Sequence, residues 1–438
     1  SFTNTINSAD STARALSINS GSGSTTLSNK IGYTNRLSTV SLTGGVVSAA
    51  NTIQLTDGLT VTNSGSSHLL GAITGTTLTK SGSGTLTLDV ANTFSSGETI
   101  TAGTLAIANA SSLTAAKNLN ISGGTLDLNG VNTASLGAVT MTGGSIEDGT
   151  HANTVITASG YSFNNDDSHP ITVSVVMAGS GSALTSTSNG TSTLSAINTY
   201  TGVTTIGAGS TIALSGSGSI ATSSDIVANG VLNISATTSG TSIVGVQGAI
   251  TGSIVLGNKT LTLSNPSSSS DNFLGVISGS GGSIVQTAGQ QTLSGNNTYS
   301  GTTTINGGTL VIGGAGYLGS GASYAGNIAI ASDALLKYSS SHDQSLSGTI
   351  SGQGGITKDV SSSSNLTISG ANTYSGATSV SVGTVTLSSS GALGSTSGAT
   401  ISSGATLAIS GSSLSISQPI TLNGDGVGSA GALLNVSG

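Results

Sequence analysis

One pattern of sixteen residues recurs along the chain and constrains its fold more than any other feature. Residues 297–312 read NTYSGTTTINGGTLVI, and residues 372–387 read NTYSGATSVSVGTVTL. Two looser copies are NTFSSGETITAGTLAI, which starts at Asn92, and NTYTGVTTIGAGSTIAL, which starts at Asn198. A catalytic motif is normally needed once, so a motif written four times indicates a scaffold.

Short strands are predicted inside and between these copies. Segments such as 85–88 (TLTL), 260–263 (TLTL) and 365–368 (NLTI) alternate polar and apolar side chains, which buries one face and leaves the other in water. Gly-Gly, Ser-Gly and Asn-Gly pairs separate them and permit the positive φ of tight corners. No segment sustains the apolar spacing of an amphipathic helix. The chain is therefore predicted to be all-β.

The spacing of the copies selects one all-β architecture. Their first Asn residues are 198 − 92 = 106, 297 − 198 = 99 and 372 − 297 = 75 residues apart. These distances divide into turns of about twenty residues, the length expected of stacked coils. Similar Gly-Xaa-Ile segments at 71–75, 275–279 and 348–352 precede three of the copies. We predict a parallel β-helix that forms one continuous elongated rod over residues 1–438, with Leu, Ile and Val stacked inward.

Composition excludes several classes of function. Of 438 residues, only 8 are Lys or Arg and 15 are Asp or Glu, so the basic patch that nucleic acids require is absent. No apolar run is long enough to span a bilayer as a helix. The first residues, SFTNTINSAD, lack the features of a signal peptide, which indicates a cytosolic protein or the processed part of an exported one. The absence of Cys is compatible with export.

The repeated unit resembles the passenger-associated transport repeat of bacterial autotransporters. The composite pattern is GxIxG…LTKSGSGTLTL…NTYSGxTTIxxGTLxI…LG, with copies near 71–113, 275–318 and 348–393 and a degraded copy near 193–220. The resemblance implies a right-handed β-helical passenger domain that is secreted through a C-terminal translocator barrel. That barrel is not part of the sequence. We therefore expect a passenger that is either tethered to the outer membrane through the translocator, which would be its only link to the membrane, or released from it.

An enzyme would need ionisable residues that converge on one groove. The charged residues are instead spread along the chain, and we predict no catalytic residue, cofactor site or metal site. Ser341, His342 and Asp343 are consecutive, and three consecutive residues cannot adopt the geometry of a hydrolase triad. A polar loop containing Asp166, Asp167 and His169 is a weak candidate for contact with a metal or a sugar.

The repeated aromatic and Asn positions are interpreted as structural, with the aromatic ring packing the same corner of each copy. A sugar-stacking platform is the alternative for the aromatic residues. The Asn side chains could ladder between turns or accept a left-handed bend. The eight positions are Asn92, Phe94, Asn198, Tyr200, Asn297, Tyr299, Asn372 and Tyr374.

The sequence therefore predicts a non-catalytic adhesin at the bacterial surface. Its expected partner is a host-cell receptor or glycan, or a second passenger, held by many weak contacts along Ser, Thr and Asn-rich faces. A structural protein that self-associates into filaments or a surface layer is the main alternative, and a polysaccharide-acting β-helix enzyme is a remote one. Ice binding requires a flat, regular Thr ladder, and the uneven spacing of the repeats predicts Thr positions that drift.

Overall fold

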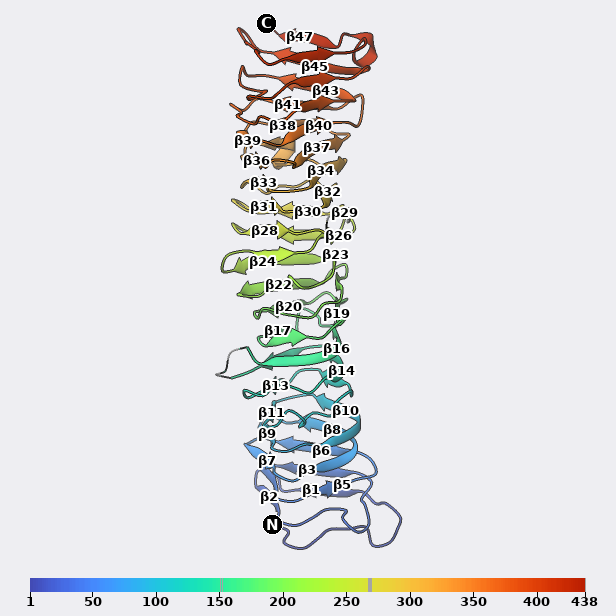
Figure 1. The fold of residues 1–438 in the computed structure, drawn as a ribbon. Helices are drawn as coiled ribbons and strands as arrows, with labels where there is room; N and C mark the ends of the chain where they lie inside the picture. The colour runs from blue at the N-terminus through green and yellow to red at the C-terminus, as the bar shows by residue number, and fades with distance from the viewer. Residues whose placement is uncertain (150, 152, 267–269, 438) are drawn as a thin grey trace. The chain divides into compact units, whose positions relative to one another are not determined.

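The computed structural model describes residues 1–149, 151, 153–266 and 270–437, and it is built from short β-strands (Figure 1). Within these residues the only helical elements are the 3-10 turns η1 (Ser320–Ala322) and η2 (Val427–Ser429). No helix in this described part is long and apolar enough to cross a membrane. The chain divides into two compact units, unit 1 (Ser1–Ser223) and unit 2 (Ser224–Gly438).

Unit 1 contains two parallel sheets, and the chain visits them in alternation as it winds. The first sheet follows the order β1 (Leu16–Asn19), β3 (Val40–Gly44), β6 (Leu59–Asn63), β8 (Ile73–Ser81), β10 (Thr93–Ile100), β12 (Leu119–Ile121), β14 (Leu136–Met141), β16 (Val155–Phe163), β19 (Ala183–Ser186) and β21 (Thr204–Ile206). The short strands β5 (Ile53–Gln54) and β18 (Val176–Ala178) pair with β8 and β16. The second sheet follows the order β2 (Ser24–Leu27), β4 (Val46–Ala49), β7 (Ser67–Leu69), β9 (Thr85–Leu88), β11 (Thr104–Ile107), β13 (Thr125–Asp127), β15 (Gly144–Glu147), β17 (Ile171–Val173), β20 (Thr191–Leu194) and β22 (Thr211–Gly216).

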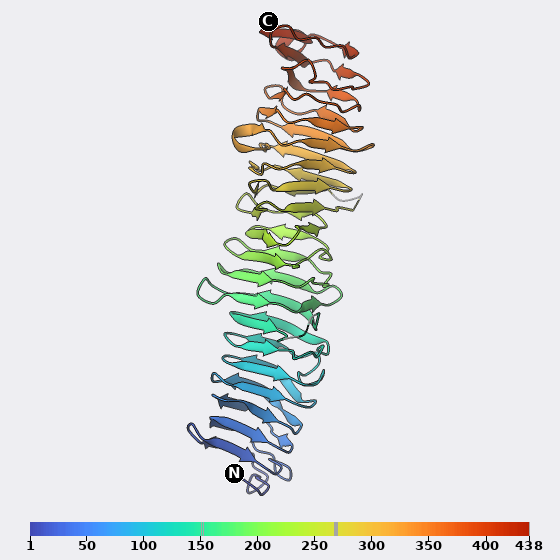
Figure 2. The same cartoon turned by 90° about the vertical axis from the view of Figure 1, so that its left-hand side faces the viewer.

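Unit 2 winds in the same way, with short strands stacked turn on turn (Figure 2). Its strands belong to five sheets. Two short rows hold β23 (Ile226–Ala228) and β26 (Val246–Gln247), and β24 (Val231–Thr237), β27 (Ser253–Val255) and β30 (Val276–Ser278). A third row holds β25 (Thr241–Ile243), β28 (Thr260–Leu263), β31 (Ser283–Gln286), β33 (Thr303–Ile305), β36 (Ile328–Ile330) and β39 (Ile350–Gly352). A fourth row holds β29 (Ser270–Phe273), β32 (Gln290–Leu293), β34 (Thr309–Gly314), β37 (Leu335–Ser340), β40 (Gly355–Lys358), β42 (Thr378–Val380), β44 (Ala399–Ile401) and β46 (Ile420–Leu422). The fifth holds β35 (Ser323–Tyr324), β38 (Gln344–Leu346), β41 (Asn365–Ile368), β43 (Gly383–Leu387), β45 (Ala405–Ser410) and β47 (Leu433–Ser437).

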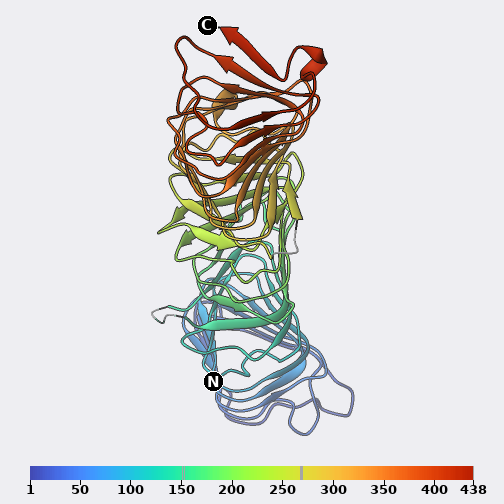
Figure 3. The ribbon, with the colours of Figure 1, turned by 45° about the horizontal axis from the view of Figure 1, so that its top comes forward.

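Strand pairing confirms the parallel β-solenoid and its turn length. Leu59 pairs with Leu78, which gives a turn of 78 − 59 = 19 residues. Leu16 pairs with Val40, a turn of 40 − 16 = 24 residues, because the intervening loop is longer. Viewed from a raised angle, the turns of each unit wind around the interior of that unit (Figure 3).

The interior is made of the apolar columns that the alternation predicts. On the second sheet of unit 1, Leu86 pairs with Leu105, Leu105 with Leu126, and Leu126 with Ile146. All four side chains are at most 1% exposed. Burying a Leu or Ile side chain contributes about 1.5–3 kcal/mol, so such columns supply much of the stability of each turn.

The outward side chains of the first sheet of unit 1 do not drift, and in this the expectation from sequence was wrong. Register places one residue from each of ten successive strands in a single column, and nine of the ten carry a hydroxyl group. The loops absorb the differences in turn length, so the strands stay in phase although the sequence spacing varies. This column, called the first column below, contains Ser17, Ser41, Thr60, Thr79, Thr99, Asn120, Thr140, Ser162, Thr185 and Thr205.

Candidate functional site

Each repeated Asn is buried and ties its own turn to the turns on either side. The Asn297 side-chain oxygen accepts a hydrogen bond from the Ile277 N–H at 3.0 Å, one turn earlier. Its amide nitrogen donates to the Gly295 carbonyl at 2.9 Å and to the Tyr317 carbonyl at 3.3 Å, one turn later. The Asn297 side chain is fully buried. One short side chain therefore satisfies backbone groups of three successive turns.

The same arrangement holds at the other three copies. The acceptor bond comes from the N–H of Ile73 to Asn92, of Met177 to Asn198 and of Ile350 to Asn372, at 2.9, 3.0 and 2.7 Å. The side-chain nitrogens donate to carbonyls of the following turn, those of Ser112, Ser219 and Ala392. The Asn residues bond to backbone and do not ladder with one another, because consecutive copies are several turns apart.

In three of the four copies of the motif, a Tyr hydroxyl and a Thr hydroxyl form a buried hydrogen-bonded pair. The Tyr200 hydroxyl lies 2.7 Å from Thr204 Oγ1, and Tyr374 makes the equivalent contact with Thr378 at 2.7 Å. The third pair joins Tyr299 to Thr303 at 2.8 Å. The three Tyr rings are fully buried, so they have no exposed face on which a sugar could stack. Burial raises the pKa of Tyr374 to about 12, which keeps its hydroxyl protonated at physiological pH.

The first copy replaces both members of the pair. Phe94 stands where the other copies have Tyr, and Glu98 stands where they have Thr. Glu98 is 1% exposed, and its Oε1 accepts a hydrogen bond from the Thr114 N–H at 2.8 Å. Within the described residues its Oε2 has no hydrogen-bond partner. Burial raises the pKa of Glu98 to about 7, so this corner contains a buried group that titrates near neutrality.

Two lysines are also buried inside turns next to the repeats. Lys80 Nζ donates to the carbonyls of Ser81 and Gly82, both at 2.8 Å, and of Ala102 at 3.1 Å. Lys358 Nζ donates to Ser364 Oγ at 2.8 Å and to the Val360 carbonyl. Burial lowers the pKa of Lys80 to about 8. The ammonium groups satisfy loop carbonyls at the corners and are not exposed to any ligand, since both side chains are fully buried.

The polar loop predicted as a weak contact site lies on the surface of unit 1. His169 Nδ1 lies 2.8 Å from Asp166 Oδ1, and the same oxygen accepts the Ser168 N–H at 2.9 Å. The hydrogen bond from His169 lowers the pKa of Asp166. Asp167 is exposed beside them. Among the residues that the structure describes, no group of three or more His, Cys, Asp or Glu side chains is arranged to hold a metal ion.

The Ser341-His342-Asp343 segment is a surface turn of unit 2. The His342 ring packs against the Tyr317 ring, with centroids 6.2 Å apart. Asp343 Oδ1 accepts the Asn365 N–H at 2.8 Å, so the carboxylate holds the next turn. The three side chains serve separate contacts and do not form a hydrogen-bonded chain.

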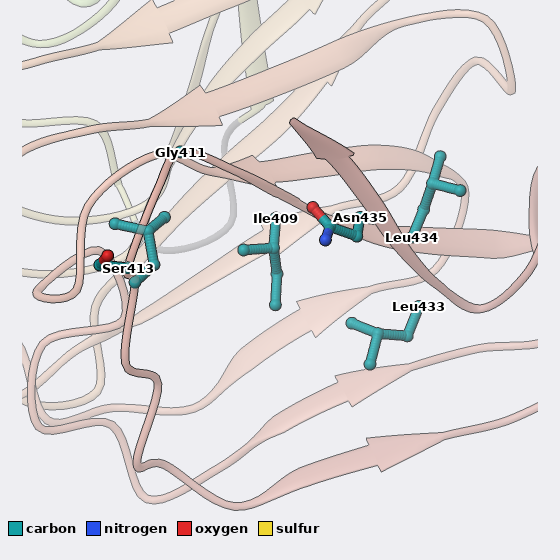
Figure 4. A pocket seen from close by; sticks show the side chains of 7 residues that line it. Ile409, Gly411, Ser413, Leu433, Leu434 and Asn435 are labelled. Carbon is teal, nitrogen blue, oxygen red and sulfur yellow. The ribbon is translucent and has the colours of Figure 1, made fainter. Parts of the chain in front are cut away.

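Two pockets of unit 2 combine apolar and small polar lining residues. One lies between β45 and β47 and is lined by Ile409, Gly411, Ser413, Leu414, Leu433, Leu434 and Asn435 (Figure 4). None of these lining residues is acidic, basic or His. A second pocket is lined by Ile250, Leu274, Val276, Ser294, Gly295, Asn296, Ala315 and His342. His342 is the only His, acidic or basic residue in that lining, so neither pocket brings together the groups of an acid–base pair.

The fold places this protein in the class of parallel β-solenoids. Its recurrent motif joins successive turns through a buried Asn side chain. The passenger-associated transport repeat matches it at residues 78–107, 184–214, 288–312 and 362–387. Each match ends on the second strand after a repeated Asn. Four copies of this repeat in a β-solenoid support an autotransporter passenger domain. No curated protein and no solved structure gave a significant match.

The alternation of side chains carried a signal for the buried ionisable residues that the sequence analysis missed. Lys80 is two residues from the inward Leu78, and Glu98 is two residues from the inward Ile100. Side chains two apart on a strand share a face, so both charged residues had to point into the core. In the sequence analysis the charged residues were considered only as candidates for catalysis, and the alternation was not applied to them.

Proposed function

We propose that this passenger domain is a non-catalytic adhesin that attaches the bacterium to host cells. Passenger repeats are typical of proteins that are secreted or held at the cell surface. The observation that carries the proposal is the combination of this repeat with outward columns of hydroxyl and amide side chains. Single contacts of this kind are weak in water, and many of them acting together produce useful avidity.

Beads coated with the purified chain test this proposal on cultured epithelial cells. Beads that bind the cells and stay dispersed by themselves would support a heterophilic adhesin. Soluble sugars added as competitors distinguish a glycan partner from a protein receptor. Beads that bind cells no better than albumin-coated beads would contradict the proposal.

Self-association is a second candidate, and the first column gives it a physical basis. A row of Ser and Thr side chains can donate to and accept from an identical row on a second copy. Side-by-side pairing would then build filaments or a surface layer. Clumping of coated beads without cells, together with regular fibres in electron micrographs, would favour this role over attachment to host cells.

A further inference from the structure

The first sheet of unit 1 carries a second column of small polar side chains beside the first column. Register pairs Asn19 with Thr43, Thr43 with Thr62, and Thr62 with Ser81. Backbone hydrogen bonds from one turn to the one before it continue the column through Thr101, Ser122, Thr142, Asn164 and Thr187. Each member lies two residues beyond a member of the first column. The first four belong to the strands and share the outward face with the first column, and from Thr101 onward each member is the first residue after its strand.

The two columns form a lattice with two fixed spacings. Neighbouring strands of a sheet are about 4.8 Å apart, which sets the distance between rows. Residues two apart on a strand are separated by about 6.6–6.8 Å, which sets the distance between columns. Repetition over nine successive turns makes this an extended array, whereas a binding pocket presents a few converging groups.

The array is neutral and its outer groups are accessible. Neither column contains a charged or aromatic residue, and the one charged side chain between them on β8, Lys80, points into the core. The side chains of Thr60, Thr79, Thr99 and Thr140 are partly exposed. Within the described structure no protein group is hydrogen-bonded to their hydroxyls, so these are free to bond outside the chain.

The second column is held more tightly. The Thr62 and Ser81 hydroxyls lie 2.7 Å apart, and the Thr101 hydroxyl donates to the Lys80 carbonyl at 3.1 Å. Farther along, Thr187 donates to Asn164 Oδ1 at 2.6 Å. These bonds along the column fix rotamers, which lowers the entropy that would be lost if the array met a rigid surface.

We propose that this face of unit 1 binds the surface of ice. A threonine hydroxyl both donates and accepts hydrogen bonds, and so does each water molecule of an ice lattice. Ice is also uncharged and regularly repeating, as the array is. A single hydroxyl gains little when it exchanges one water partner for another. Binding therefore depends on many hydroxyls meeting the lattice at once.

The composition of the face disfavours other partners. A polyanion or an acidic lipid surface would require Lys or Arg, which neither column contains. Sugar recognition commonly uses aromatic rings as stacking platforms, and the columns contain none. With polyanions, acidic lipids and sugars disfavoured, the partner that this face matches is an extended neutral lattice of hydrogen-bonding groups. The proposal is independent of attachment to host cells.

The test measures ice recrystallisation in solutions of the whole chain at matched concentrations. We expect the wild-type protein to keep ice grains small at concentrations where an equal mass of serum albumin does not. The double variant Thr99→Tyr with Thr140→Tyr places two rings on the first column, on β10 and β14. It should require at least a tenfold higher concentration for the same effect.

The matched control is Thr104→Tyr with Thr125→Tyr, on the outward side of β11 and β13 of the second sheet. Tyr is a good strand former, so circular dichroism should show the same fold and melting for both variants. The control should keep the activity of the wild type. Grain growth as fast as in albumin, or equal activity of the two double variants, would overturn the proposal. Binding to chitin or cellulose without any effect on ice would overturn it in favour of a polysaccharide lattice.

Discussion

The buried Asn amides act at the scale of single residues. Asn combines one acceptor and two donor hydrogens on a short side chain, which is the set needed to reach a turn on either side. Asp would offer acceptors only, and Ser is too short to bridge two carbonyls. The Asn297 amide contacts backbone groups of Ile277 and Tyr317, which are twenty residues away on either side. Asn is the shortest side chain that carries this set of groups.

Replacement of Asn297 by Ala should weaken the turns around it. The Ile277 N–H would lose its side-chain acceptor, whereas the Tyr317 carbonyl keeps the backbone N–H of residue 297, so the cost should be roughly 1–3 kcal/mol. Hydrogen exchange should quicken for amides between residues 275 and 318, most of all at Ile277. The exposed neighbour Asn296 provides the control, because Asn296→Ala should change local stability by less than about 0.5 kcal/mol. Equal exchange in the two variants would show that the Asn amide has no clamping role.

The first corner offers a test of the hydroxyl pair. Phe94→Tyr alone places a hydroxyl against the Glu98 carboxyl, and Glu98→Thr alone removes the acceptor of the Thr114 N–H. The double variant restores the Tyr–Thr pair of the other three corners. We expect a favourable coupling of about 0.5–1.5 kcal/mol in the double-mutant cycle, the value of one buried hydrogen bond. Additive effects in urea unfolding would mean that the pair does not form at this corner.

Glu98 should also make stability depend on pH. Its pKa in the folded chain, about 7, lies above the ordinary value of 4.5, so folding favours the protonated form. The stability that Glu98 contributes is therefore complete below about pH 4.5 and is lost as the pH rises to about 7, by roughly 2–4 kcal/mol. Lys80 titrates near pH 8 in the folded chain and lies outside this window.

The variant Glu98→Gln isolates this effect. Its unfolding free energy, measured in urea, should change less than that of the wild type between pH 4.5 and 7.5. The difference between the two proteins then reports Glu98 alone, because every other titrating group is shared. Parallel pH profiles for the two proteins would show that the Glu98 pKa is not raised by folding.

Sequence alone located the residues of these corners but not their partners. The repeat marks Asn297 and Tyr299 as equivalent to Asn372 and Tyr374, since identical letters recur in identical order. Which backbone groups the Asn contacts depends on the length of the turns before and after it. That length varies, so the Ile277 and Tyr317 partners follow only from the three-dimensional register. Burial of Glu98 followed from alternation and was overlooked.

At the scale of elements, the sequence predicted the short alternating strands but not the long ones. The TLTL alternation predicted β9 and β28, with the same bounds that the structure shows. It did not predict the long strands β8, β10 and β16, which run through polar and Gly-containing segments. Polar side chains give no periodic signal there, and the pairing with neighbouring turns decides the strand.

Corner glycines have different roles, which substitution by Ala can separate. Gly308 has φ +69°, and a Cβ atom there would lie 2.0 Å from the Gly289 carbonyl oxygen of the previous turn. Gly321 has φ +62°, and nothing lies within 4 Å of its Cβ position. Gly321→Ala should cost about 1–2 kcal/mol from backbone strain alone. Gly308→Ala should cost roughly 3 kcal/mol or more, because the turns must also move apart.

Local hydrogen exchange of the two Gly variants measures these costs. Gly308→Ala should expose amides of β32 and β34, which flank the corner, whereas Gly321→Ala should affect only the residues near η1. A larger effect at Gly321 than at Gly308 would show that close stacking of turns does not limit the side chain at this corner.

Regular stacking within each unit determines how the molecule responds to damage. The strands pair with those of the turn before and the turn after, as β33 does with β31 and β36. Stability in such an array is approximately a sum over turns and their neighbours.

The varying loop lengths explain why the sequence did not predict the aligned columns of unit 1. Alignment is a property of strand register, and loops of different length conceal it in the spacing along the sequence.

A proline in the middle of β33 tests this local behaviour. Thr304 pairs with Val285 and with Ala329, so Thr304→Pro removes a ladder hydrogen bond inside a central strand. We expect hydrogen exchange to rise by at least a hundredfold in β31, β33 and β36, with little change in the strands of unit 1. Thr304→Val, which keeps the N–H and the strand preference, should exchange like the wild type. Because each turn is stabilised by its neighbours, the effect should decline with distance along unit 2. Loss of protection in unit 1 to the same extent would show that the chain unfolds as one cooperative block.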